Sequence, residues 1–225
     1  MRYSRNESTL SAEENLRLRS FKVAIVGCGG LGGYLIEMAA RLGIGTLTVI
    51  DGDVFNLSNL NRQLLSEESN MGLYKSHVAV ERIRRINSDV KITSVPLYLD
   101  VNNADALLRD HDVVLDALDA LRPRFIVQQA CERLGIPMIH GAIAGWYAHV
   151  ATIYPGDRLL EQIYPQPMQE LDNPLGNPAF TPAFAASIQI AEMLKVLLER
   201  GDTLKGQLLQ VDLLMHRYET IPLKA

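Results

Sequence analysis

A dense cluster of glycines near the N-terminus constrains this chain more than any other feature. The stretch VAIVGCGGLGGYL, residues 23–35, holds five of the 16 glycines within seven residues, after an apolar run and before a helical pattern. Gly27, Gly29 and Gly32 make the spacing G-x-G-x-x-G, in which backbone N–H groups and a helix N-terminus approach a phosphate without Cβ atoms in the way. The spacing serves both dinucleotides and ATP, so it predicts a nucleotide-binding turn and leaves the nucleotide open.

Apolar runs and helical patterns alternate along most of the chain. Strand-like runs at 22–27, 46–51, 90–97, 113–118 and 136–140 are separated by helical patterns at 31–42, 75–86, 103–109 and 122–134. Further strands are expected at 149–154, 207–211 and 216–221, and a last long helix at about 184–199. The alternation predicts a Rossmann-like α/β fold, with a mainly parallel sheet flanked by helices and an antiparallel C-terminal portion.

Length and composition indicate a single domain over residues 1–225. A chain of 225 residues that is 48% hydrophobic and 21% charged can bury one good core. Residues 1–20 are expected to form an N-terminal arm and helix, because Ser11 and Glu14 have the spacing of a capping box. Residues 155–182 hold six of the ten prolines and are expected to form a long crossing loop.

The charge balance argues against nucleic-acid and membrane partners. The formal net charge is −4 and the sequence pI is near 5.7, so the chain offers no general attraction for polyanions. The most apolar segment, residues 184–198, is interrupted by Gln189, Glu192 and Lys195, which predicts a buried helix and not a membrane span. Because the N-terminus lacks an apolar signal-peptide core, we expect a cytoplasmic location.

Residues after the second expected strand distinguish ATP from a dinucleotide. Asp51 ends that strand 19 residues after Gly32, where a nucleotide fold places the carboxylate that binds a ribose. Arg62 and Lys75 follow it. Either cation alone is typical of a solvated surface. A triphosphate carries about four charges, against about two for a pyrophosphate, and needs added cations, so the two together favour ATP over NAD.

Three segments carry a resemblance to a known family. VAIVGCGGLGG, LTVIDGDVFNLSNLNRQLL and MGLYKSHVAVERIRRIN resemble the MoeB, ThiF and HesA family, relatives of the ubiquitin-activating enzymes, and the similarity extends over nearly the whole chain. The resemblance implies ATP-dependent adenylation of the C-terminal glycine carboxylate of a small ubiquitin-like sulfur-carrier protein ending in Gly-Gly, with release of pyrophosphate. By position, it implies a nucleotide site made of Gly27, Gly29, Gly30, Gly32, Asp51, Asp53, Asn59, Arg62, Gln63 and Lys75.

The resemblance also gives roles to residues that sequence patterns alone leave ambiguous. Asp119, in VLDALDALRPR, matches the acidic residue associated with Mg²⁺, although its position also suits an N-cap of the helix expected at 122–134. Arg124 is either a site residue or a helix-surface arginine. Arg5, in RYSRN, matches an arginine that reaches into the active site of the other protomer, which implies a homodimer. Without the resemblance, a charged arm of this kind is typical of a frayed terminus.

The implied catalysis rests on positioning and charge neutralisation. Attack of a peptide carboxylate on ATP brings two anions together, so Arg5, Arg62, Lys75 and the Mg²⁺ held by Asp119 are the expected catalytic elements. A carboxylate is already ionised at pH 7, so no general base is needed.

The cysteines mark a departure from the family pattern. Many relatives bind zinc through two C-x-x-C pairs, and some use a cysteine of the crossing loop for a thioester or persulfide. This chain has two cysteines, Cys28 and Cys131, neither of them in that loop. We expect no zinc, two buried structural thiols and a reaction that ends at adenylation. The five histidines lack metal-ligand spacing, and His140 is expected to be a buried structural residue or to line the site.

Other functions are also compatible with these residues. The segment DALDALRPR also resembles the tRNA threonylcarbamoyladenosine dehydratases, which activate a carboxylate on a modified tRNA base, but the acidic chain lacks an obvious basic extension. A non-catalytic partner subunit is a further alternative. The chain retains every expected ATP-site residue, which argues against it. An NAD oxidoreductase is disfavoured, because no hydride-transfer group is apparent. The sequence leaves the carrier and its pathway open.

Overall fold

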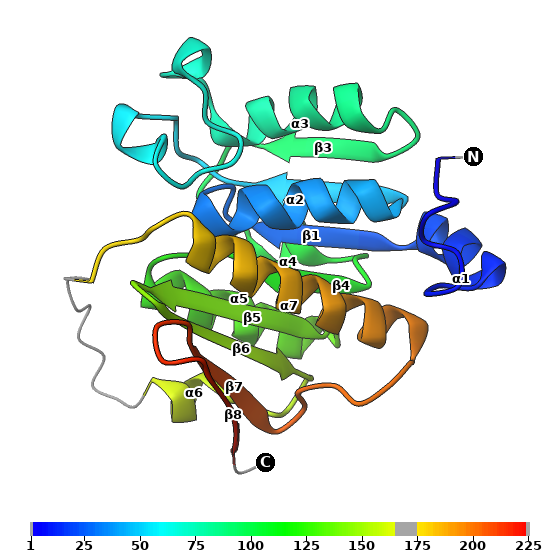
Figure 1. Cartoon of the computed structure of the whole chain (residues 1–225), viewed down its shortest axis with the longest axis vertical. Coiled ribbons are helices and arrows are strands. Elements are labelled where there is room, and N and C mark those ends of the chain that lie inside the picture. Colours follow the sequence, from blue (N-terminus) through cyan, green and yellow to red (C-terminus); the bar gives the residue numbers. More distant parts are fainter. Residues whose placement is uncertain (1, 165–174, 224–225) are drawn as a thin grey trace.

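The computed structural model describes residues 2–164 and 175–223. They form one eight-stranded sheet, flanked by helices, with the strand order β3-β2-β1-β4-β5-β6-β7-β8 (Figure 1). The strands are β1 (Lys22–Val26), β2 (Thr46–Ile50), β3 (Lys91–Val95), β4 (Val113–Asp116), β5 (Met138–Ala144), β6 (Tyr147–Ile153), β7 (Gln207–Asp212) and β8 (Arg217–Pro222). Pairing is parallel from β3 to β5 and antiparallel from β5 to β8, which confirms the predicted fold class.

Helices cover both faces of the parallel half of the sheet. They are α1 (Ala12–Arg17), α2 (Gly30–Leu42), α3 (Lys75–Ile86), α4 (Ala104–Leu108), α5 (Leu121–Leu134), α6 (Leu160–Ile163) and α7 (Phe180–Leu198), with short 3₁₀ turns η1 (Leu18–Ser20), η2 (Leu57–Asn59) and η3 (Glu68–Asn70). Figure 1 shows α2 and α7 side by side on one face, with α4 and α5 behind the sheet.

The apolar core lies in two layers, one on each side of the sheet. In β1, Val23 and Ile25 pack in the layer below α2, α3 and α7, whereas Ala24 and Val26 pack in the layer below α4 and α5. The strand is therefore apolar at successive positions, as parallel strands covered on both faces are. Because β1 is packed on both faces, its end is held in place, and so is the start of the glycine turn that follows it.

Several predicted boundaries agree closely with the structure. Helix α3 has the predicted bounds, and α1 begins with the predicted capping box, in which Ser11 and Glu14 each accept a hydrogen bond from the other's backbone N–H. The predicted end of the crossing loop at Pro182 is wrong, because α7 already begins at Phe180. A proline in the first helical turn lacks only an N–H that would have no intrahelical partner, so Pro182 does not stop the helix. The predicted loop also contains α6, and residues 165–174 of it lie outside the described residues.

Helix α7 lies in the core of the molecule. By length and composition alone it would also suit a membrane span, but it packs against α2, β4, β5 and β6. Two of its polar residues, Gln189 and Glu192, are buried and hydrogen-bonded. Gln189 donates to the Asp116 and Ile139 carbonyls at 2.9 and 3.0 Å, and Glu192 accepts from the Thr152 hydroxyl at 2.6 Å. These bonds explain how polar side chains are tolerated on a buried helix.

The turn from β1 into α2 has space only for glycine at two positions. Gly27 has φ +99°, and a Cβ there would lie 2.6 Å from the Ala117 carbonyl oxygen. A Cβ on Gly32 would lie 1.8 Å from the Gly27 carbonyl oxygen. The first turn of α2 therefore packs directly on the backbone of the turn that precedes it.

We predict that Gly32→Ala lowers the free energy of unfolding by about 3 kcal/mol, because the new methyl group would force the helix away from rigid backbone. Gly30→Ala is the matched control. A Cβ there would meet the Arg62 Cγ at 3.5 Å, an ordinary contact, and alanine favours the helix. Urea unfolding of both variants measures the difference. Equal stability of the two variants would contradict this account of the turn.

Candidate nucleotide-binding site

The glycine turn leaves the N-terminus of α2 without a side-chain cap. Gly29 is the N-cap residue and provides no side-chain hydrogen bond. The first backbone N–H groups of a helix have no intrahelical acceptor and carry partial positive charge, so they suit an anionic ligand. The turn faces the segment after η2, since a Cβ on Gly29 would lie 3.6 Å from the Gln63 side-chain nitrogen.

Asp51 fastens the glycine turn to the end of β2. One carboxylate oxygen accepts from the Cys28 N–H at 2.7 Å, and the other accepts from the Asp53 N–H at 2.8 Å. Burial raises the pKa of Asp51, against the opposing effect of the two N–H groups and the nearby Lys75 charge. Each oxygen keeps a second acceptor position, so a ribose hydroxyl is a compatible partner.

Lys75 is a buried cation at the start of α3. Its residue is 6% exposed, so the alternative of a solvated surface lysine is wrong. Its Nζ lies 2.5 Å from Asp53 Oδ2. Burial alone would raise the pKa of Asp53. Hydrogen bonds from Lys75 and from the Val54 N–H, together with the Lys75 charge, outweigh burial, so the pKa of Asp53 falls below its ordinary value. The pair places one cation, partly neutralised, at the carboxyl end of β2.

The segment that contains η2 contributes three predicted site residues. Asn59 is buried, and its Oδ1 accepts from the Asn56 N–H at 2.9 Å, which shapes the local turn. Arg62 donates to the Ser58 carbonyl at 2.9 Å and forms no ion pair with a described residue. Gln63 is buried beside Gly29, and its Oε1 has no hydrogen-bond partner within the described chain. Arg62 and Gln63 therefore retain bonding capacity toward a ligand next to the glycine turn.

Asp119 follows β4 on the other side of the glycine turn. The segment is close, because a Cβ on Gly27 would touch the Ala117 carbonyl. Asp119 is exposed and makes no hydrogen bond or ion pair with any residue that the structure describes. The N-cap of α5 is Ala120, so the alternative of Asp119 as that cap is wrong.

The donor set around Asp119 fits a magnesium ion held jointly with phosphates. Within residues 2–164 and 175–223, no three His, Cys, Asp or Glu side chains gather as a metal cage. Mg²⁺ in nucleotide sites commonly uses one or two carboxylates and completes its shell with phosphate oxygens and water. A single exposed carboxylate next to an anion-binding turn meets that requirement.

Arg124 is buried, so its alternative as a helix-surface arginine is wrong. It is 6% exposed, and its Nε donates to the Leu118 carbonyl at 3.1 Å.

Sequence patterns missed two neighbours of Arg124, the residues Asp116 and Tyr164. His140, fully buried, bonds to Asp116 at 2.7 Å and confirms the structural alternative for that histidine. The one available signal was a charged residue, Asp116, at the end of an otherwise apolar strand.

Arg5 lies away from the glycine turn of its own chain. Tyr3 packs at the C-terminal end of α2, where its ring lies against Gly43, and its hydroxyl accepts from the Asn87 side chain at 2.7 Å. This arm is at the opposite end of the sheet from the start of α2 (Figure 1). Arg5 is exposed there. It does not join its own site, and action on a second protomer stays a prediction.

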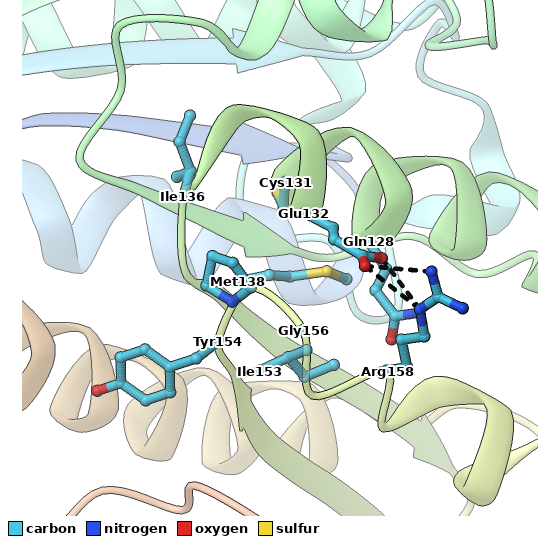
Figure 2. Close-up of a pocket in the computed structure, with 10 residues that line it drawn as sticks. Gln128, Cys131, Glu132, Ile136, Met138, Ile153, Tyr154, Gly156 and Arg158 are labelled. Carbon is cyan, nitrogen blue, oxygen red and sulfur yellow. Dashed lines mark hydrogen bonds and ion pairs between the residues drawn. The ribbon is translucent and has the colours of Figure 1, made fainter. Parts of the chain in front are cut away.

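Both cysteines are buried, as predicted. Burial, reinforced by the Asp51 charge, raises the pKa of Cys28 well above its ordinary value. Burial, reinforced by the Asp116 charge, raises the pKa of Cys131 to about 12. Figure 2 shows Cys131 on α5 near Met138 and Gln128, in a small pocket whose lining includes no residue of the glycine turn. Neither thiol has the lowered pKa of a reactive cysteine.

Comparisons with known proteins agree with this architecture. The model of the ThiF family matches residues 3–225. The chain is 33% identical to the SAMP-activating enzyme E1 of Haloferax volcanii over 227 aligned positions, covering 98% of this chain and 84% of that protein. It is 34% identical to the sulfur carrier protein adenylyltransferase of Thermus thermophilus over 208 positions, covering 88% and 77%.

Solved structures show the same fold. E. coli MccB, solved together with MccA-N7isoASN, superposes with a TM-score of 0.86 at 21% identity, covering 99% of this chain and 72% of that one. E. coli tRNA N6-threonylcarbamoyladenosine dehydratase gives a TM-score of 0.75 at 24% identity, covering 88% and 94%. These likenesses concern the fold. The family model and the named relatives confirm an enzyme of the adenylyltransferase class, and the chain belongs to the ThiF family.

Proposed function

We propose that this enzyme adenylates the C-terminal carboxylate of a small ubiquitin-like sulfur-carrier protein, using ATP and releasing pyrophosphate. The observation that carries the proposal is the convergence of an uncapped helix N-terminus, the cations Arg62 and Lys75, and the free carboxylate of Asp119. They surround the ends of β1, β2 and β4. Here the strand order reverses direction, and open α/β sheets bind ligands at such a point. The names of the relatives support the carrier as substrate.

The reaction joins two anions. A carboxylate oxygen of the carrier attacks the α-phosphorus of ATP, the bond from that phosphorus to the leaving pyrophosphate oxygen breaks, and an acyl adenylate forms. Lys75 and Arg62 offset the phosphate charge, and the N–H groups of the glycine turn orient the phosphates. Mg²⁺, held by Asp119 and phosphate oxygens, would supply further positive charge. The carboxylate is ionised at pH 7, so the enzyme needs to position it rather than deprotonate it.

We propose that the covalent work of this chain ends at adenylation. The chain has two cysteines in all, and each is buried with a raised pKa. A thioester or persulfide would require an accessible thiolate. Two cysteines are also too few for the four-thiolate zinc site of many relatives. Sulfur delivery to the carrier would therefore be the task of another protein.

A tRNA substrate is the less favoured alternative. The dehydratase likeness concerns the fold, whereas the relatives of 33% and 34% identity are named for carrier proteins. The net charge of −4 also favours a protein substrate over a polyanion. A non-catalytic subunit is disfavoured, because Lys75, Arg62 and Asp119 are all present around the turn.

We propose a homodimer in which Arg5 of each protomer completes the site of the other. Arg5 is exposed, without an ion pair in the described chain, and its arm lies at the far end of the sheet from its own glycine turn. A two-fold arrangement allows both arms to exchange in the same way.

Asp119→Ala should lower carrier-dependent pyrophosphate exchange by about a hundredfold, the effect of losing one charge-stabilising element. The assay follows labelled pyrophosphate into ATP, with a purified ubiquitin-like carrier ending in Gly-Gly. Asp202→Ala, at an exposed aspartate after α7, is the matched control and should leave exchange within about twofold of the native rate. Native exchange by Asp119→Ala would contradict the assigned role.

Arg5→Ala should be nearly inactive alone, and activity should return when it is mixed with Asp119→Ala. The Arg5→Ala protomer keeps an intact core and receives an intact arm from its partner. Random pairing of equal amounts makes about half the dimers mixed, with one complete site in two, so about a quarter of native exchange should return. A mixture that stays inactive despite verified subunit exchange, or a fully active Arg5→Ala, would refute action between protomers.

A further inference from the structure

The backbone that leads into Asp119 is held from two sides by buried polar side chains. The Leu118 N–H donates to Asp116 Oδ1 at 3.0 Å. The Leu118 carbonyl accepts from Arg124 Nε at 3.1 Å and also from Arg124 Nη2. Both peptide groups of Leu118 are thereby fixed, one residue before the carboxylate assigned to the metal.

Two further residues close these contacts into a ring. Arg124 Nη1 donates to the Tyr164 hydroxyl at 2.9 Å, and that hydroxyl lies 3.1 Å from His140 Nε2. His140 Nδ1 lies 2.7 Å from Asp116 Oδ2. The four side chains come from the ends of β4 and α6, from α5 and from β5, so the ring joins segments far apart in the sequence.

One arrangement of protons satisfies every member of the ring. Burial lowers the pKa of His140, an effect that the Asp116 hydrogen bond opposes and the Arg124 charge reinforces, so the ring nitrogen Nε2 is free to accept. The Tyr164 O–H then donates to Nε2, Nδ1–H donates to Asp116, and the Tyr164 oxygen accepts from Arg124. The remaining charges are Asp116 and Arg124, whose Oδ2 and Nε lie 3.8 Å apart. Loss of the Tyr164 hydroxyl would leave Arg124 Nη1 and His140 Nε2 without this hydrogen-bond partner.

Helix α6 brings Tyr164 to the ring. Gln128 of α5 accepts from the Leu160 N–H at 3.0 Å and donates to Glu161 Oε2 at 2.9 Å. Arg158, just before α6, forms an ion pair with Glu132 of α5 at 3.2 Å (Figure 2). Tyr164 is therefore anchored to α5 by contacts that do not involve Leu118.

We propose that this ring is a positioning device for the metal–nucleotide site, in which Tyr164 and Arg124 fix the Leu118 peptide groups and thereby aim the Asp119 carboxylate. The inference rests on the proposed function, because it takes Asp119 as the residue that meets Mg²⁺. The Asp119 side chain has no partner in the described chain, so its aim depends on its backbone. A buried Arg–Asp pair is seldom the most stable filling for a core, which favours a role beyond stability.

The test is Tyr164→Phe, read by metal binding rather than by turnover. Mn²⁺ serves as a paramagnetic probe, titrated by electron paramagnetic resonance in the presence of a non-hydrolysable ATP analogue. Outer-shell partners of metal ligands typically alter affinity by 10- to 100-fold, so we expect Mn²⁺ to bind about tenfold more weakly. Metal-free binding of the analogue should stay unchanged. In an Asp119→Ala background, itself weaker in Mn²⁺ binding, Tyr164→Phe should have no further effect.

Tyr154→Phe is the matched control. Its ring lies under the Lys205 ammonium at 5.2 Å, and its hydroxyl has no hydrogen bond to a described residue, so native Mn²⁺ affinity is expected. Arg124→Lys keeps the charge but removes the fork on the Leu118 carbonyl, and it should weaken Mn²⁺ binding at least as much as Tyr164→Phe. Circular dichroism of each variant verifies the fold.

Native Mn²⁺ affinity in Tyr164→Phe would overturn the inference. Equal losses with and without Asp119 would overturn it too, because the ring would then act by another route. If Asp119→Ala leaves Mn²⁺ affinity unchanged, the ring has no metal ligand to aim and the inference also fails. The proposed substrate is tested separately, since absence of carrier-dependent exchange leaves the Mn²⁺ result intact.

Discussion

The close contact between Gly32 and the Gly27 carbonyl is the constraint on which the rest of the site depends. A Cβ would lie 1.8 Å from that oxygen, so only glycine lets α2 begin so near the end of β1. The same turn packs against the Ala117 carbonyl, directly after β4. Asp51 secures the same turn from β2 through the Cys28 N–H. Backbone packing and the Asp51 carboxylate together therefore set the geometry of the turn, which leaves the first N–H groups of α2 available to an anion.

The charged side chains around the turn differ in how firmly other residues hold them. Lys75 is buried and paired with Asp53, whereas Arg62 bonds to neutral oxygens and Asp119 bonds to no described residue. One cation is therefore preorganised, and a second cation and a carboxylate remain available to a ligand. This division suits a substrate that brings its own negative charge and its own metal, because the protein then needs little rearrangement when the substrate binds.

The sequence predicted the local features well and the distant ones poorly. The glycine spacing and helical period located the β1–α2 turn and α3, because both signals arise within a few residues. The start of α7 was placed too late, since Pro182 is tolerated in a first turn. The ring around Leu118 was missed, because Tyr164 is 40 residues from Arg124 and their contact follows only from the strand order. Arg124 was ambiguous for the same reason.

Titration calorimetry with ATP and with NAD, each in the presence of Mg²⁺, shows which nucleotide the site binds. We infer that the glycine turn, Lys75, Arg62 and Asp119 together bind a triphosphate. We expect ATP to bind with Mg²⁺ and NAD not to bind, because a dinucleotide leaves the added cations without a matching charge. Tight binding of NAD without binding of ATP would contradict it.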